Sequence, residues 1–190
     1  MTLSRADDVL LAEDCPYHIN IVYRSDGFLV SNVGTFLYAA LARGGAAIAI
    51  ATGLHLDGLA RELAGRGLDL TALRREERYF VLDAVALYER FTTHGVLDEE
   101  RAASIVRDIL DRARWATRPV SLYGEVVGLF AERHDLVGAA RLEDLWDLML
   151  EERPHAALCG YPGQVFRGAT QRRKLQMLCA WHKHTIRSRS

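Results

Sequence analysis

Glu125 is the carboxylate in this sequence that is best placed for chemistry. It stands between a predicted strand at residues 120–123 and the apolar segment VVGLFA, which must be deeply buried if it is helical. Burial raises the pKa of a carboxyl group and suits it to proton transfer or to ligand binding. A carboxylate is also favoured at the first turn of a helix, so a capping or structural pairing role for Glu125 remains open.

Other polar residues stand where further predicted strands end. Ligands of parallel α/β proteins bind at the carboxyl ends of the strands, because loops and helix amino termini converge there. These predicted ends comprise residues 23–27, 52–55, 83, 123–125 and 159–161. From them we select Tyr23, Glu125, Cys159 and Tyr161 as candidate ligand-binding residues. A carboxylate among phenolic hydroxyls and apolar walls predicts a pocket for a small, mostly apolar ligand with one polar group.

The turn after the first predicted strand lacks phosphate-binding chemistry. In many α/β proteins a phosphate-binding loop with the pattern GxxxxGK[ST] occupies this place. The segment YRSDGFLVSN has one glycine and no lysine, and Asp26 within it would repel a triphosphate. We therefore expect no ordinary ATP hydrolysis, no catalytic residues and no bound cofactor.

The histidines offer a weaker signal. His18 begins its strand, at the end of the sheet opposite the expected ligand site, so we expect a hydrogen-bonded structural histidine. His182 and His184 are two residues apart, which suits a metal only if that segment is extended and other ligands are near. Cys179 is close in sequence, but no second cluster of ligands supports a site. No metal centre is predicted.

Composition places the chain among ordinary globular proteins. Its 190 residues suffice for one well-buried core, with 49% hydrophobic and 26% charged residues. A formal charge of −1 gives no global attraction to nucleic acid or to a membrane, so neither is an expected partner. The start MTLSRADDVLLAED is unlike a secretion signal, and AAIAIATGL is too short to span a bilayer. Three cysteines without CxxC spacing fit a reducing cytoplasm.

Apolar segments separated by turn signals predict alternating strands and helices. The expected strands are residues 18–23, 46–52, 78–82, 120–123 and 156–161, and the expected helices are residues 28–41, 55–64, 84–91, 99–115, 126–131, 142–150 and 170–182. Asp83 and Asp98 are positioned to cap the helices that follow them. Because the strands are apolar on both faces, the predicted class is α/β, three-layered, with a mostly parallel sheet covered by helices on both faces.

Trp146 is expected in the core of this fold. It shares one helical stripe with Leu142, Leu145, Met149 and Leu150. A stripe of this kind faces the sheet rather than solvent.

Several of these segments resemble the MEDS domain, a sensory domain named for methanogens, methylotrophs and the dichloromethane-responsive regulator DcmR. The motifs are HINIVY, ARGGAAIAIAT, DAVALYERFTTHGVLDEERAASIV, SLYGEVVGLF, LEDLWDLML, ALCGYPGQVF and LCAWHKHTI, in that order. The resemblance implies a RecA-like or KaiC-like domain without its phosphate loop that senses small molecules. The family's motif residues fall on His18, Tyr23, Gly124, Glu125, Cys159, Tyr161 and His182. The family more often has Met and an aromatic residue where this chain has Val126 and Val127.

The expected organisation is an extension at residues 1–14, a MEDS-like sensory domain at 15–186 and a tail at 187–190. We expect a non-catalytic domain that binds a small molecule or a protein partner in signal transduction or transcriptional control. The alternatives are a degenerate RecA-like nucleotide-binding enzyme and a pure interaction module. Many relatives carry a DNA-binding or kinase module that this sequence lacks, so its output is expected to pass through a regulatory partner or a homo-oligomer.

Overall fold

The fold is built on a six-stranded sheet with the strand order β3-β2-β6-β7-β1-β8, in which every described pairing is parallel. The computed structural model describes residues 17–114, 117–152, 155–180, 182 and 184–188. The strands are β1 (Tyr17–Tyr23), β2 (Ala46–Ala51), β3 (Tyr79–Asp83), β6 (Val120–Gly124), β7 (Ala156–Pro162) and β8 (His184–Arg187). The predicted α/β class with a parallel sheet is confirmed.

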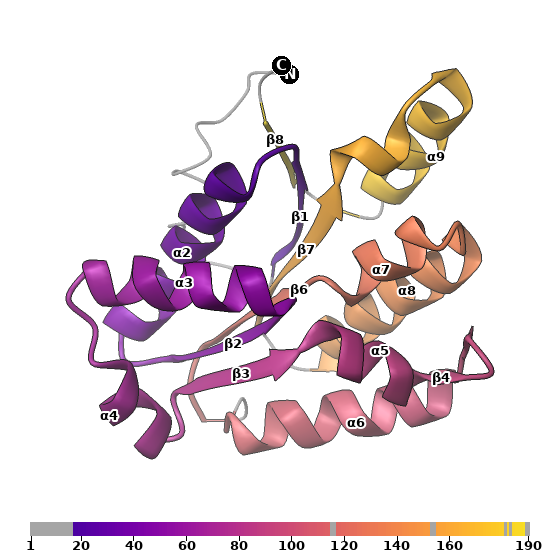
Figure 1. The fold of residues 1–190 in the computed structure, drawn as a ribbon. Coiled ribbons are helices and arrows are strands. Elements are labelled where there is room, and N and C mark those ends of the chain that lie inside the picture. Colours follow the sequence, from indigo (N-terminus) through magenta and orange to yellow (C-terminus); the bar gives the residue numbers. More distant parts are fainter. Residues whose placement is uncertain (1–16, 115–116, 153–154, 181, 183, 189–190) are drawn as a thin grey trace.

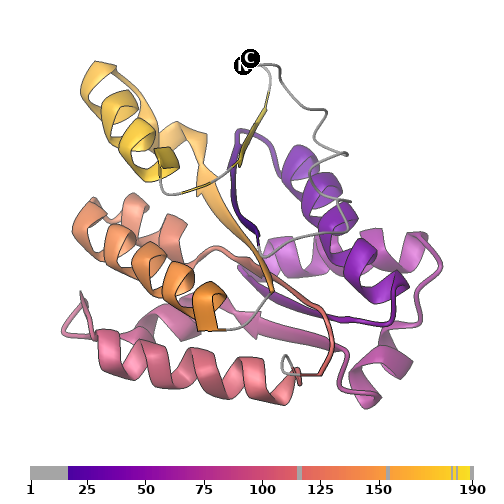
Figure 2. The ribbon, with the colours of Figure 1, turned by 180° about the vertical axis from the view of Figure 1, so that it is seen from behind.

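Helices cover both faces of this sheet (Figure 1; Figure 2). One face carries α2 (Asp26–Ala42), α3 (Gly53–Gly65) and α4 (Leu70–Arg75). The opposite face carries α5 (Ala84–Phe91), α6 (Glu99–Arg112), α7 (Val126–Glu132), α8 (Leu136–Glu152) and α9 (Ala169–Ala180). A 3-10 turn, η1 (Gly163–Phe166), joins β7 to α9, and a small hairpin pairs β4 (Thr92–Thr93) with β5 (Val96–Leu97). The three predicted layers are confirmed.

The helix starts follow from local sequence. Asp83 accepts a hydrogen bond from the Ala86 amide at 2.8 Å, and Asp98 accepts one from the Arg101 amide at 3.1 Å. Both side chains thereby satisfy amide groups that lack a partner in the first helical turn. The predicted caps of α5 and α6 are confirmed.

Successive residues of each strand point to opposite faces of the sheet and so pack into two hydrophobic cores, one on each face. Tyr23 packs on the face covered by α2, α3 and α4, whereas Val22 belongs to the core under the other helices. Trp146 lies in that second core with 2% of its surface exposed, which confirms its predicted burial.

Three elements were absent from the sequence prediction: α4, the β4–β5 hairpin and β8. Each is short and lacks an apolar run, so periodicity gives little signal. β8 joins the edge of the sheet beside β1 and ends at Arg187, one residue into the predicted tail. The Ser188 amide continues the contact by donating to the Val22 carbonyl at 3.1 Å.

The strand order creates two crevices at the carboxyl edge of the sheet. β2 leads into α3 on one face, whereas its neighbour β6 leads into α7 on the opposite face. β1 and β7 diverge in the same way, because β1 leads into α2 and β7 leads through η1 into α9 (Figure 1). Such topological switch points are the usual ligand sites of open α/β sheets.

Candidate functional site

The crevice between β2 and β6 is filled by a hydrogen-bonded group that we call the Glu125 network: Glu125, Tyr123, Thr52, His55 and Asp26. Glu125 is 4% exposed. Its Oε1 atom accepts from the Tyr123 hydroxyl at 2.8 Å and from His55 Nδ1 at 2.6 Å, and its Oε2 atom accepts from the Thr52 amide at 2.8 Å. Both oxygens of this carboxylate are therefore engaged by the protein itself.

The network reaches solvent through His55. The Nε2 atom of this histidine lies 3.2 Å from Oδ1 of Asp26, whose side chain is 61% exposed. Burial opposes the charged imidazole, but the hydrogen bond and charge of Glu125, with a smaller contribution from Asp26, raise the pKa of His55 above its ordinary value. The Tyr23 ring stands edge-on to the imidazole at 5.6 Å, and burial raises the pKa of its hydroxyl.

Glu125 occupies the N-cap position of α7 but makes no capping hydrogen bond there. Its carboxylate instead binds the amide of Thr52, which is the N-cap residue of α3. The side chain thus ties the carboxyl end of β6 to the start of a helix on the opposite face. The structural pairing anticipated for this residue is present, and a direct role in ligand binding stays a prediction.

Replacing His55 by asparagine should make stability less dependent on pH. A histidine whose pKa is raised by folding contributes stability that is complete below about pH 6.5 and is lost as the pH rises through the folded-state pKa. Denaturant unfolding of wild type and His55→Asn should therefore show a larger difference in free energy at pH 6 than at pH 9. His94→Asn, an exposed change in the β4–β5 hairpin, is the control. A difference that stays constant across this range would contradict a charged His55–Glu125 pair.

A second polar group lies on the opposite face of the sheet, beneath α8 and α9. We call His18, Glu143, Cys159 and His182 the buried quartet, since all are buried. The Glu143 Oε2 atom lies 2.9 Å from His18 Nε2 and 3.2 Å from the Cys159 sulfur. Its Oε1 atom lies 3.3 Å from His182 Nε2 and accepts a hydrogen bond from the Tyr161 hydroxyl.

Buried charges shift the pKa values in this group. Burial disfavours a charged His18, but hydrogen bonds to Asp147 and Glu143 outweigh it and raise the pKa of His18 to about 9. Burial acts against the Glu143 carboxylate in the same way, yet the two histidines hold the pKa of that carboxyl far below its usual range. The same carboxylate adds to burial in raising the pKa of the Cys159 thiol.

The expectation of one pocket shared by Tyr23, Glu125 and Tyr161 is wrong. Tyr23 is level with Pro162 in the β1–β7 register, and Tyr161 is level with Val22. Neighbouring residues of a strand face opposite sides of a sheet, so Tyr23 and Tyr161 point to different faces. The Tyr161 hydroxyl binds Glu143, not Glu125.

The phenol beside Glu125 is Tyr123. A Cβ atom at Gly160 would lie 2.6 Å from the Tyr123 hydroxyl, so the glycine of LCGY leaves the room that this ring needs. Gly124 ends β6 and places Glu125 at the carboxyl edge of the sheet.

The structure thus divides the predicted residues between two sites. Tyr23 and Glu125 both contact His55. His18, Cys159, Tyr161 and His182 surround Glu143. His18 is hydrogen-bonded as expected, with Nδ1 2.7 Å from Asp147 Oδ1. Sequence reasoning missed Glu143. Its position in the sequence could have indicated burial: Glu143 follows Leu142 and precedes Trp146 by three residues, so it lies on the helical stripe that faces the sheet.

The crevice between β1 and β7 holds a cavity of about 790 Å³. We call it the arginine cavity, because three arginines line it and no acidic side chain does so in the described part of the chain. Its lining residues are Val22, Arg24, Gly163, Gln164, Phe166, Arg167, Gly168, Leu175, Gln176, Arg187 and Ser188. They come from the ends of β1 and β8, from the segment after β7 and from α9.

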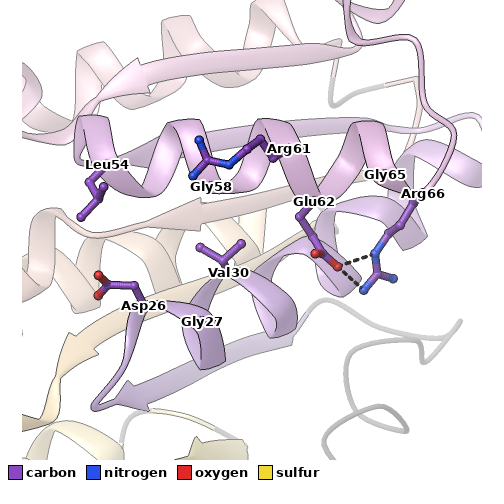
Figure 3. A pocket seen from close by; sticks show the side chains of 9 residues that line it. All are labelled: Asp26, Gly27, Val30, Leu54, Gly58, Arg61, Glu62, Gly65 and Arg66. Atoms are coloured by element: carbon purple, nitrogen blue, oxygen red, sulfur yellow. Dashed lines mark hydrogen bonds and ion pairs between the residues drawn. The ribbon is translucent and has the colours of Figure 1, made fainter.

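A second hollow of about 660 Å³ runs between α2 and α3 (Figure 3). Its charged residues include Glu62 and Arg66, which pair with each other at 2.8 Å. Asp26 stands at the other end of the groove, near the exposed Leu54 (Figure 3). A molecule in this groove would meet the Glu125 network only through Asp26.

The family model described as MEDS, MEthanogen/methylotroph, DcmR Sensory domain, matches residues 17–183. No curated protein matches the chain. Among the described residues, no helix combines the length and apolar character needed to cross a bilayer. The matched region contains the sheet and its covering helices, and the chain belongs to the MEDS family of sensory domains.

Proposed function

We propose that this chain is a non-catalytic sensory domain that binds a small organic anion in the arginine cavity. The observation that carries this proposal is a hollow at a topological switch point lined by Arg24, Arg167 and Arg187 without a neutralising carboxylate among the described residues. At the other switch crevice both oxygens of the Glu125 carboxylate are already hydrogen-bonded to protein groups.

The lining chemistry selects the ligand class. Guanidinium groups match carboxylate and phosphate oxygens in geometry as well as charge. Val22, Phe166 and Leu175 supply apolar surface beside them. A volume of about 790 Å³ suits a small molecule. We infer an organic acid whose apolar part rests on these three side chains and whose head group binds the arginines.

The surroundings of the cavity favour binding over catalysis. Within the described residues, its lining contains no histidine, cysteine, lysine or carboxylate that could act as a nucleophile or general base. The sequence YRSDGFLVSN also lacks the lysine and glycines of a phosphate-binding loop. A bound molecule is therefore held and not transformed.

A route from the cavity into the protein core supports a sensory role. Arg187 Nη2 lies 3.6 Å from the Cys179 sulfur in α9, and the same sulfur accepts a hydrogen bond from Asn20 Nδ2 at 3.0 Å. Asn20 lies in β1 between His18 and Val22, and Leu175 of α9 lines the cavity. A ligand that engages Arg187 would change the position of α9 against the sheet, which a regulatory partner or second copy could detect.

Titration calorimetry with organic acids and their neutral analogues tests whether the arginine cavity binds organic anions. We expect butyrate, hexanoate, benzoate or phenyl phosphate to bind, and the neutral analogues butanol, hexanol and benzyl alcohol to bind much more weakly. Arg167→Gln/Arg187→Gln should weaken binding of the acids by about 10-fold or more, because the charge-assisted hydrogen bonds are lost. Arg101→Gln, an exposed change on α6, is the control.

Two outcomes would overturn the proposal. Equal binding of acids and alcohols, or unchanged affinity in the double variant, would remove the arginines from the site. Release of phosphate from ATP and magnesium that is abolished by Glu125→Gln would favour the alternative of a degenerate nucleotide-binding enzyme.

A further inference from the structure

We propose that the buried quartet binds a divalent metal ion of the zinc class. His18, Glu143, Cys159 and His182 each offer one ligand atom, and these four atoms all lie within 4.8 Å of one another. Ligand bonds of about 2.0 to 2.3 Å to a central ion require separations of this order in a tetrahedral site. The inference is independent of the arginine cavity.

Both imidazoles are oriented by their second nitrogen. His18 Nδ1 lies 2.7 Å from Asp147 Oδ1, and His182 Nδ1 lies 2.9 Å from the Leu178 carbonyl, to which it donates. Histidines that bind metals make this pair of contacts, to a carboxylate or a backbone carbonyl, and direct Nε2 to the ion. In the quartet both Nε2 atoms face Glu143.

His182 has one ring nitrogen, Nε2, that makes no hydrogen bond among the described residues. Its Nδ1 donates to the Leu178 carbonyl, so Nε2 is the ring atom that faces Glu143. Nε2 is buried and, among the described residues, makes no hydrogen bond, although Glu143 Oε1 lies 3.3 Å away. A cation at this point would engage both the imidazole nitrogen and the carboxylate oxygen.

Charge and ligand type point to the metal class. A thiolate from Cys159 and the Glu143 carboxylate carry two negative charges, which a divalent ion neutralises within a buried site. Binding would release two protons to solvent, the thiol proton of Cys159 and the Nε2 proton of the His18 imidazolium. Two imidazoles and a thiolate favour zinc and exclude magnesium and calcium, which prefer oxygen ligands.

The carboxylate is itself held in place. The Tyr161 hydroxyl donates to Glu143 Oε1, which leaves Oε2 directed at His18 and Cys159. The four ligands come from β1, α8, β7 and the segment that follows α9. A bound ion would therefore fasten α8 and the end of α9 to the centre of the sheet.

Cobalt titration of the full chain, after dialysis against a chelator, tests the site. We expect one Co²⁺ per chain, with a thiolate-to-cobalt charge-transfer band and the intense visible bands of tetrahedral geometry. Zinc should displace the cobalt and raise the melting temperature. Cys159→Ser should abolish the charge-transfer band, whereas Cys179→Ser should retain it.

Zinc affinities of further variants distinguish binding at the buried quartet from binding at other metal-ligating side chains. His18→Gln or His182→Gln should weaken zinc binding by more than about 100-fold, and Asp147→Asn, a positioning change, by about 10- to 100-fold. His94→Gln, an exposed change in the β4–β5 hairpin, should have no effect. Circular dichroism shows whether each variant is folded, and the wild-type cobalt spectrum decides the question without any variant. Absence of stoichiometric binding, octahedral bands, or a charge-transfer band that survives in Cys159→Ser would overturn the proposal.

Discussion

Replacing Glu143 by alanine should lower the free energy of unfolding of the metal-free protein by about 3 to 5 kcal/mol. Glu143 is fully buried and is the common partner of His18, Cys159, Tyr161 and His182. Its removal would leave a buried imidazolium at His18 with only the partly exposed Asp147 as counter-charge. It would also leave the Tyr161 hydroxyl buried without its acceptor, which adds to the cost.

Urea unfolding in the presence of a chelator measures this effect. Asp144→Ala is the matched control, since Asp144 is the next residue of α8 but is exposed. A change on an exposed helix surface should alter stability by less than about 0.5 kcal/mol. A loss below about 1 kcal/mol for Glu143→Ala would mean that the quartet contributes little to the fold.

Trp146→Ala should cost about 3 to 5 kcal/mol, the usual range for a buried large aromatic side chain. Trp146 is 2% exposed and is among the largest fully buried side chains of the described chain. It lies on the same core-facing side of α8 as Leu142 and Met149. Alanine would leave a cavity there that the packed sheet cannot close.

Leu148→Ala is the control for this change, because Leu148 lies on the same helix with 48% of its surface exposed. Denaturant midpoints should separate the two variants clearly. Similar small losses in both would show that α8 packs less tightly on the sheet than its burial implies.

The sequence predicted the elements well where apolar periodicity is strong. The VVGLFA segment is a buried helix, as expected, because Gly128 lets α7 lie directly on β7: a Cβ atom there would come within 2.6 Å of the Gly160 carbonyl oxygen. β8 was missed because HTIR carries only one large apolar residue and gains its place from pairing with β1. Pairing between distant segments leaves no local signal.

The candidate sites were harder to predict, because they depend on register and strand order. Tyr23 and Tyr161 both end strands, but the register places them on opposite faces. His18 and His182 stand far apart in the sequence, and their rings come within 4.2 Å of each other because β8 pairs with β1. The sequence around Glu143 is that of an ordinary helix, and its partners His18, Cys159 and His182 come from distant segments that only the three-dimensional structure brings together.

Hydrogen exchange tests the central claim, that this sensory domain binds an organic acid at the β1–β7 crevice. Amide exchange of the full chain would be followed by mass spectrometry with and without one organic acid. The acid is the one among butyrate, hexanoate, benzoate and phenyl phosphate that raises the melting temperature most. The proposed site predicts slower amide exchange in η1, in α9 and at the end of β1. The exchange rates of α2 and α3 should not change, apart from the first turn of α2, which follows β1. Protection confined to the groove between α2 and α3, or no protection at any saturating concentration, would contradict it.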